Sequence, residues 1–454
     1  MGSRAREAVA PLYLLACLIA GGSAQGAWAN MVLQLVGIAI LAWAAVAHVD
    51  QPLIPAARQL LILTAITVAV ILVQLVPLPP SIWMNMGGRA PIAAGFRTLG
   101  LAPPAMPVSL TPYGSVSSLL ALIPPLAMFA AIVRLKAYRT RWLTAALLLG
   151  TVGGILLGVL QLSATDAAAS PWYLYAQSSF GVATGFFANG NHMAILLVVS
   201  LPFLAALLGS ARGGDRQLNS ALVTIATALA IVIVVGIAIN RSLAGIGLAF
   251  PVLAASALLV LPKRSSMRRL ALVLAGLLVI GAVGVLATSS TNGPEWGSDV
   301  SGSVHSRREM LDTSVEMTRD FMPWGSGLGS YRQVYQLYEQ RTYVTDTYVI
   351  HAHDDYLEIA VELGVAGILL MCLFLAWWGR VVFRAWRYRD AGAYGRAASI
   401  ASAAILIHSS VDFPLRTAAI AVTFAMCLAL LIERRASKAD NREDLRPTRH
   451  VIVK

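Results

Sequence analysis

The sequence predicts an all-α protein that crosses a membrane many times. Its 454 residues are 57% hydrophobic and only 12% charged, whereas an ordinary soluble domain is about 25% charged. Apolar runs of about 18–25 residues recur along the chain, and each is long enough to cross a bilayer as a helix. Strand-like alternation is absent, so helices that satisfy their own backbone hydrogen bonds are favoured over a membrane β-barrel.

We expect about twelve transmembrane helices, which divide the chain into four parts. The spans lie near residues 9–27, 31–48, 58–79, 114–134, 142–162, 190–210, 219–239, 242–262, 270–288, 356–379, 397–413 and 416–433. The parts are spans one to nine within 1–288, a large loop at 289–355, spans ten to twelve within 356–433, and a polar tail at 434–454. A loop this long is more than a connector needs, and amphipathic patterning predicts helices at 306–321 and 331–341 within it.

The distribution of basic residues indicates which side of the membrane each loop faces. Twenty-five of the 34 Lys and Arg residues fall on the side that holds both termini, and nine on the other. The positive-inside rule expects this bias when both termini are cytoplasmic. The net charge of +12 therefore reflects topology, and nucleic acid is not needed to explain it. Residues 1–29 also resemble a signal peptide ending in Ala27-Trp28-Ala29, whose removal would leave eleven spans with unchanged sidedness.

The most polar stretch beside a span is YVIHAHDDYLEIAVELGVAG, residues 348–367. It contains His353, then Asp354, and then Glu358 and Glu362 on the first turns of the following helix. A histidine at the end of a polar loop suits a general base, because the ordinary pKa of this residue type is near neutral. The two glutamates either shape an acceptor pocket or simply place negative charge at a helix start. No residue set has metal-ligand spacing, so no metal or cofactor is predicted.

Two further groups of polar residues lie where spans begin on the outer side. Arg241, in the short turn INRSLAG, either snorkels to the interface or faces a cavity. In GFFANGNHMA, Asn189 is a candidate helix cap. Asn191 and His192 are then expected to face a polar cavity or to make interfacial hydrogen bonds.

The large loop and the last hairpin add charged candidates. Arg307 and Arg308 begin the first predicted loop helix, which ends at the glycine-rich break PWGSGLG. This break follows a helix and lacks the Lys-Ser/Thr of a phosphate-binding loop, so it is read as a tight turn. Asp412 and Arg416 are four residues apart and are expected to form a structural ion pair, although Pro414 interrupts the turn between them.

Taken in order, these motifs resemble the O-antigen ligase/polymerase superfamily of bacterial envelope glycosyltransferases over residues 180–430. The resemblance comprises N-x-N-H at an outer helix start, an arginine in a short outer turn, a loop arginine before P-x-G-x-G-x-G, and the pattern H-[NSQ]-x9-G-x2-G. His353, Gly364 and Gly367 fit the spacing of that last pattern, and Asp354 departs from it. Asp354 either holds the His353 ring by a hydrogen bond or marks a different acceptor.

The resemblance implies a GT-C-like enzyme of the bacterial inner membrane, with both termini cytoplasmic and the active site periplasmic. It implies a metal-independent, inverting transfer of a glycan from undecaprenyl diphosphate to lipid A-core or to a growing polysaccharide. His353 would take the proton of the acceptor hydroxyl, and Arg241 and Arg307 would bind the diphosphate. The supporting candidates are Asn189, Asn191, His192, Asp354, Glu358 and Arg416.

Several functions remain open at this stage. The acceptor distinguishes a ligase from a repeat-unit polymerase or a protein O-glycosylating enzyme, and Asp354 weakens the ligase pattern. A transporter of envelope precursors would show inverted repeats and broken helices that meet at the midplane. The polar residues instead gather on the outer side and no repeat is visible, which disfavours a transporter. A non-catalytic envelope scaffold is the remaining alternative.

Overall fold

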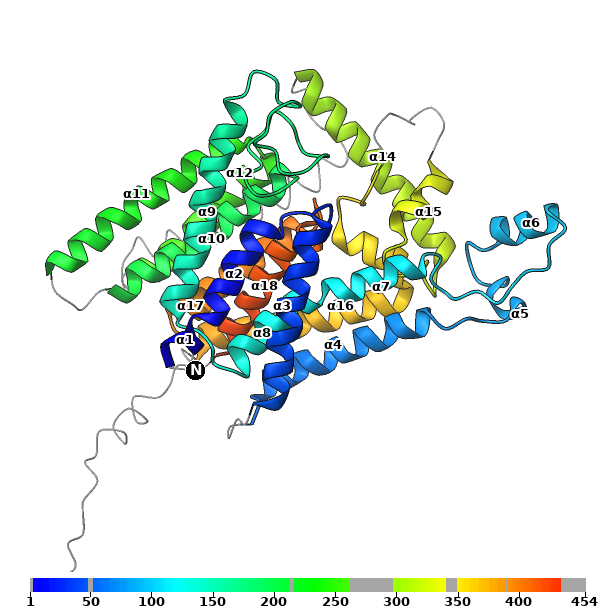
Figure 1. Ribbon diagram of the computed structural model, residues 1–454, viewed down its shortest axis with the longest axis horizontal. Helices are drawn as coiled ribbons and strands as arrows, with labels where there is room; N and C mark the ends of the chain where they lie inside the picture. Colours follow the sequence, from blue (N-terminus) through cyan, green and yellow to red (C-terminus); the bar gives the residue numbers. More distant parts are fainter. Residues whose placement is uncertain are drawn as a thin grey trace, which may run out of the picture.

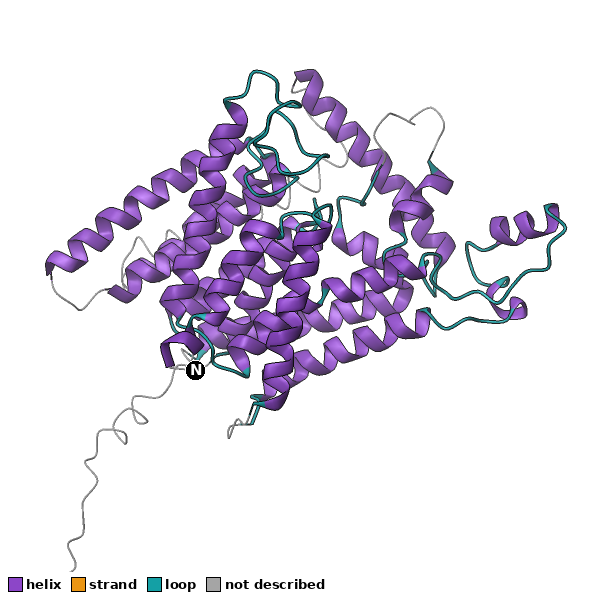
Figure 2. Cartoon of the chain, viewed as in Figure 1, coloured by secondary structure: helices purple, strands orange, loops and turns teal. Residues whose placement is uncertain are grey.

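The computed structural model describes residues 3–47, 52–211, 216–261, 297–339, 349–388 and 391–433. Within these ranges every regular element is a helix, and a single isolated bridge joins Leu78 and Met106 (Figure 2). The long helices are α3 (Ala27–Val46), α4 (Pro55–Gln74), α9 (Thr140–Leu162), α10 (Gly190–Ala211), α11 (Arg216–Asn240), α12 (Leu243–Val260), α14 (Gly297–Phe321) and α16 (Asp355–Arg387). The shorter elements are α1 (Ser3–Glu7), α2 (Val9–Ala20), α5 (Pro80–Trp83), α6 (Ala90–Thr98), α7 (Pro112–Ala121), α8 (Ile123–Val133), α15 (Tyr331–Tyr338), α17 (Ala393–His408), the 3-10 helix η1 (Pro414–Arg416) and α18 (Ala418–Ile432).

The described helices confirm an all-α polytopic membrane protein. Eight stretches of the described chain are long and apolar enough to cross a membrane: α3, α4, α7 with α8, α9, α10, α11, α12 and α16. Three other predicted spans, the first and the last two, correspond to the shorter helices α2, α17 and α18, of 12, 16 and 15 residues. The predicted span at 270–288 lies outside the described residues, so the total of twelve stays a prediction.

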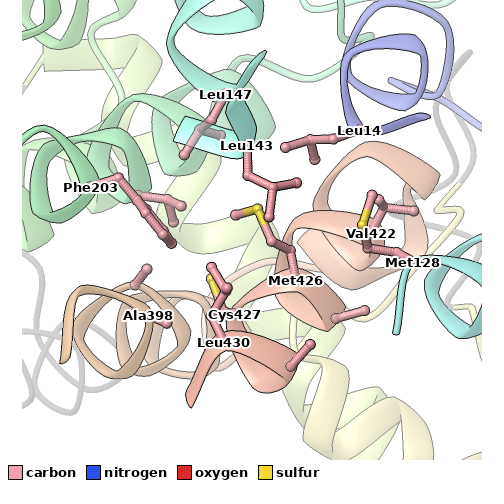
Figure 3. Close-up of a cluster of buried hydrophobic side chains, with 14 of the residues drawn as sticks. Leu14, Met128, Leu143, Leu147, Phe203, Ala398, Val422, Met426, Cys427 and Leu430 are labelled. Atoms are coloured by element: carbon pink, nitrogen blue, oxygen red, sulfur yellow. The ribbon is translucent and has the colours of Figure 1, made fainter. Parts of the chain in front are cut away.

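Helices α10, α17 and α18 form the centre of the bundle (Figure 1). Figure 3 shows Met426, Cys427 and Leu430 of α18 beside Phe203 of α10 and Ala398 of α17. Small side chains on α17 let these helices approach closely, which is how membrane helices associate without a hydrophobic driving force. By contrast, α3, α4 and α11 carry many exposed Leu, Ile and Val residues, as expected of helices that face lipid.

The glycine-rich turn at 323–329 connects α14 and α15 and lies against α16. Ser326 N–H donates to the Val361 carbonyl at 3.0 Å, and Gly327 N–H donates to the Glu362 carbonyl at 2.9 Å. Both loop helices were predicted, although α14 begins earlier, at Gly297, and α15 ends at Tyr338. Residues 340 and 341 of the second predicted helix lie outside the described part of the chain.

Helix α16 is broken at Gly364, where φ is 59° and ψ is −143°. A Cβ atom at this position would lie 2.2 Å from the Pro323 carbonyl oxygen, so only glycine fits both the backbone angle and the space. Val365 N–H, freed by the break, donates to that same carbonyl at 3.0 Å. The first glycine of the G-x2-G pattern therefore docks the glycine-rich turn onto α16 and fixes the short segment at 355–363.

Replacing Gly364 with alanine should destabilise the protein. A left-handed backbone costs a non-glycine residue roughly 1–3 kcal/mol, and the clash with Pro323 adds to this. Thermal unfolding of the purified protein in detergent measures the effect. Gly379→Ala is the matched control, because Gly379 lies in the regular part of α16 with nothing within 4 Å of an added Cβ. Equal melting temperatures for the two variants would contradict the proposed role of Gly364.

Candidate functional site

The predicted site residues converge where the start of α16 meets the turn at 409–416. Asp355 N–H donates to the Ser409 carbonyl at 2.8 Å, and the Tyr356 hydroxyl donates to the Leu406 carbonyl at 2.7 Å. Asp354 caps α16 by accepting hydrogen bonds from Tyr356 N–H at 2.9 Å and Leu357 N–H at 3.0 Å. The beginning of α16 is therefore held both by its own cap and by the last hairpin of the bundle.

His353 immediately precedes this cap and contacts Asp412. Its Nδ1 lies 3.2 Å from Asp412 Oδ1, and its backbone has a φ of 52°, which is uncommon for a residue with a side chain. The other carboxylate oxygen, Oδ2, accepts a hydrogen bond from Asn189 Nδ2 at 3.5 Å. The alternative in which Asp354 holds the His353 ring is wrong, because the Asp354 side chain is directed to the N–H groups of α16. Asp412 orients His353 instead.

Asp412 is buried in the turn after α17, and its neighbours favour the ionised carboxylate. Burial alone would raise its pKa, but the hydrogen bond from His353 and the nearby His192 and His408 lower the pKa below its usual range. A charged Asp412 favours the tautomer of His353 with the proton on Nδ1. The lone pair is then on Nε2, where it can accept a proton from a substrate.

Phe413 lies at the centre of a cluster of histidines. Its ring centroid is 4.3 Å from that of His351, 5.0 Å from that of His353 and 5.1 Å from that of His192. His192 is only 2% exposed, and both of its ring nitrogens lack a hydrogen-bond partner within the described chain. The prediction that His192 faces a polar cavity is therefore wrong, and its ring packs against Phe413 and Phe187.

Asn189, the predicted cap, and Asn191 both fix the start of α10 through hydrogen bonds. Asn189 Oδ1 accepts from Asn191 N–H at 2.8 Å. Asn191 Oδ1 in turn accepts from Ser242 Oγ at 2.8 Å. Asn240 Nδ2 donates to the carbonyls of Ala183 at 2.7 Å and of Gly190 at 2.9 Å. These bonds attach the short turn between α11 and α12 to the same helix start that contacts Asp412.

Arg241 lies in that attached turn, between Asn240 and Ser242. Its φ is 60° and its side chain is exposed. The neighbouring hydrogen bonds hold its backbone and leave the guanidinium accessible. Arg307 belongs to α14, but its side chain lies outside the described residues, so its role stays a prediction.

Arg416 contacts three carboxylates on the first two turns of α16. Its Nη2 lies 3.1 Å from Glu358 Oε1 and 3.3 Å from Glu362 Oε2, and its Nε lies 3.5 Å from Asp355 Oδ1. The predicted pairing of Arg416 with Asp412 is wrong, because η1 turns Arg416 toward α16 while Asp412 contacts His353. Glu358 and Glu362 are thus ion-pair partners and do more than place negative charge at a helix start.

The same glutamates also bind the segments around His353. Glu358 Oε1 lies 2.9 Å from His351 Nδ1, and its Oε2 accepts from Ala352 N–H at 3.1 Å. Glu362 Oε1 accepts from Gly329 N–H at 2.9 Å and Tyr331 N–H at 3.1 Å. The cluster therefore connects the chain before His353, the glycine-rich turn and the start of α15 to α16.

Residues 228–372 match the family model described as O-antigen ligase. The matched range contains Arg241, Arg307, His353, Gly364 and Gly367, and it supports assignment of the chain to the O-antigen ligase superfamily that its motifs predict. A search of curated proteins finds no match to the chain.

Removing the charge of Arg416 should strongly destabilise the site. Breaking a buried ion pair on one side costs about 3–5 kcal/mol, and Arg416→Gln removes the guanidinium that all three carboxyl groups contact. Arg416→Lys should lose less, because one ammonium cannot reach all three groups. Thermal unfolding of the purified variants measures both effects.

The double variant Arg416→Gln with Glu358→Gln provides the control for charge. It should recover part of the lost stability, since it removes one of the unpaired carboxylates. Wild-type stability of Arg416→Gln alone would show that the cluster does not support the fold.

Proposed function

Because residues 228–372 match the O-antigen ligase family, we propose that this multi-pass membrane protein is a glycosyltransferase with a periplasmic active site in the bacterial inner membrane. Its donor is a glycan on undecaprenyl diphosphate, and its acceptor is a hydroxyl group of lipid A-core or of a growing polysaccharide. The observation that carries this proposal is the contact between His353 Nδ1 and Asp412 Oδ1 at 3.2 Å. It supplies an oriented base at the outer end of a membrane helix.

In the proposed reaction, His353 Nε2 takes the proton of the acceptor hydroxyl as its oxygen attacks the anomeric carbon. The bond between that carbon and the diphosphate oxygen breaks, and the diphosphate leaves with the electron pair. A single displacement of this kind inverts the anomeric configuration. Asp412 orients the imidazole and stabilises the imidazolium that forms, while Asn189 holds the second oxygen of Asp412.

Arg241 would bind the diphosphate, with Arg307 as the second arginine. A guanidinium offers charge-assisted and bidentate hydrogen bonds to phosphate oxygens, and these strengthen as charge builds on the leaving group. The support for Arg241 is its exposed side chain on a turn held by Asn240 and Ser242. An exposed guanidinium on a fixed backbone can meet a membrane-bound diphosphate with little loss of backbone freedom.

The position after His353 does not argue against a ligase. Asp354 caps α16, and Asn, Ser and Asp are all favoured capping residues. Aspartate therefore replaces Asn or Ser of the pattern without loss of this role. A repeat-unit polymerase and a protein O-glycosylating enzyme remain alternatives for the acceptor.

The break of α16 does not support a transporter. The Val361 and Glu362 carbonyls accept from Ser326 and Gly327, and Glu362 also accepts from Gln74 Nε2 at 3.1 Å. Transporter helices are broken where freed backbone groups coordinate a substrate or an ion. Here the freed groups bind the glycine-rich turn.

His353→Ala should lower glycan transfer roughly 10²–10⁴-fold, the usual contribution of a general base. Arg241→Ala should also reduce transfer strongly, because it removes charge stabilisation of the leaving group. Surface glycan analysed on gels from the native host, at matched protein levels, tests both variants. The control is Arg97→Ala, since Arg97 is exposed on α6 and outside the site. Unchanged glycan from both site variants would rule out the mechanism.

Deletion of the gene should reveal the acceptor. A ligase predicts loss of the lipopolysaccharide ladder with accumulation of lipid-linked polymer. A polymerase predicts caps of a single repeat or loss of exopolymer. A normal glycan profile in the deletion strain would contradict both.

A further inference from the structure

A basic pocket of about 150 Å³ lies between the ends of α18, α4 and α16, the last two of which run side by side in Figure 1. Arg380 and Arg384 of α16 line it together with Gln59 of α4 and Leu431 of α18. Arg384 lies 29 residues after Asp355, and a helix of that length spans roughly 40 Å. A bilayer with its headgroups is about 40–45 Å thick. The pocket is therefore at the membrane surface opposite the candidate functional site.

The positive charge of this pocket is not balanced within the part of the chain that the structure describes. Arg380 Nη2 donates to the neutral side-chain oxygen of Gln59, and the Arg384 guanidinium has no hydrogen-bond or ion-pair partner among the described residues. Glu433 also lines the pocket, but its carboxylate is in an ion pair with Lys136. Two arginine charges therefore remain available to an anion.

The spacing of the two arginines suits a phosphate group. Arg380 and Arg384 are four residues apart, so their side chains are neighbours on one face of α16. Like charges at this spacing repel each other and destabilise a helix, and an anion between them would remove that repulsion. Each guanidinium can donate two parallel hydrogen bonds to phosphate oxygens. The volume of the pocket is roughly five times the 30 Å³ that a water molecule occupies in the liquid, which leaves room for one phosphate.

The apolar part of the lining indicates that this phosphate belongs to a lipid. Ile54, Val381 and Ile432 line the same pocket as the arginines. Tyr388, which follows the last turn of α16, is 59% exposed, and exposed tyrosines are typical of the level of lipid headgroups. The positive-inside rule predicts that this surface is cytoplasmic, where basic pockets between membrane helices bind anionic lipid headgroups.

We propose that this pocket is a binding site for an anionic phospholipid, with the headgroup phosphate between Arg380 and Arg384. The bound lipid joins the ends of α4, α16 and α18 on the side of the membrane opposite the candidate functional site. Because the lipid binds the folded protein, it stabilises the bundle in proportion to its affinity. The site is separate from the proposed glycosyl transfer and uses none of its residues.

Native mass spectrometry of the delipidated full-length protein in detergent measures binding of the first lipid. Dioleoyl-phosphatidylglycerol should bind roughly tenfold more tightly than dioleoyl-phosphatidylcholine, which has the same acyl chains and no net charge. The double variant Arg380→Gln with Arg384→Gln should weaken phosphatidylglycerol binding roughly 30-fold, about fivefold for each arginine. Equal binding of the two lipids to the wild-type protein would overturn the proposal.

The matched control is Arg58→Gln with Arg387→Gln, because both arginines are exposed at the same end of the bundle and neither lines the pocket. This control removes the same charge and should change the affinity less than about threefold. Equal weakening by the two double variants would indicate diffuse attraction of lipid to a basic surface and would overturn the proposal.

Two further measurements separate a lipid site from a site for free phosphate and from a defect in folding. Glycerol 3-phosphate in large excess should leave phosphatidylglycerol bound, and displacement would assign the pocket to a soluble phosphate and overturn the proposal. Without lipid, both double variants should melt close to the wild type, because the replaced side chains are exposed. Phosphatidylglycerol should then raise the melting temperature of the wild type and of the control more than that of Arg380→Gln with Arg384→Gln. An equal rise in all three proteins would contradict a site between these arginines.

Discussion

The ion pairs of Arg416 with Asp355, Glu358 and Glu362 hold together the segments that position His353. The arginine comes from the turn between the last two helices, and the carboxylates come from the first turns of α16. Glu358 also binds the chain before His353, and Glu362 binds the glycine-rich turn. Arg416 is the arginine that all three carboxyl groups contact, and an unpaired buried charge is far more costly than a lost hydrogen bond. The left-handed backbone of His353 is sustained by the segments that this cluster joins.

Hydropathy predicted the helices, and motif spacing singled out His353 as the proposed base, but the carboxylate that contacts His353 could not be found from the sequence. His353 and Asp412 are 59 residues apart, and no local pattern connects them. The four-residue spacing of Asp412 and Arg416 suggested a helical pair, whereas Pro414 starts a separate 3-10 helix that directs the two side chains to different partners. The kink at Gly364 could not be found from the sequence either, because the apolar pattern continues through it. The left-handed backbone and the close approach of Pro323, which together require glycine, arise only in the folded structure.

The charges of the site are divided between its two sides. Carboxylates gather at the start of α16, whereas Arg241 is exposed on a turn attached to the start of α10. Asp412 connects the two sides, because its carboxylate contacts both His353 and Asn189 at the start of α10.

Reconstituted transfer tests the central claim most directly. Purified protein in proteoliposomes would receive a labelled glycan on undecaprenyl diphosphate and a glycolipid acceptor, with glycosylated acceptor and released undecaprenyl diphosphate both quantified. The wild type should form the two products in equal amounts with inversion at the anomeric carbon, and His353→Ala should form neither at a comparable rate. Wild-type rates from His353→Ala, or a product with retained configuration, would contradict catalysis by an oriented His353 base.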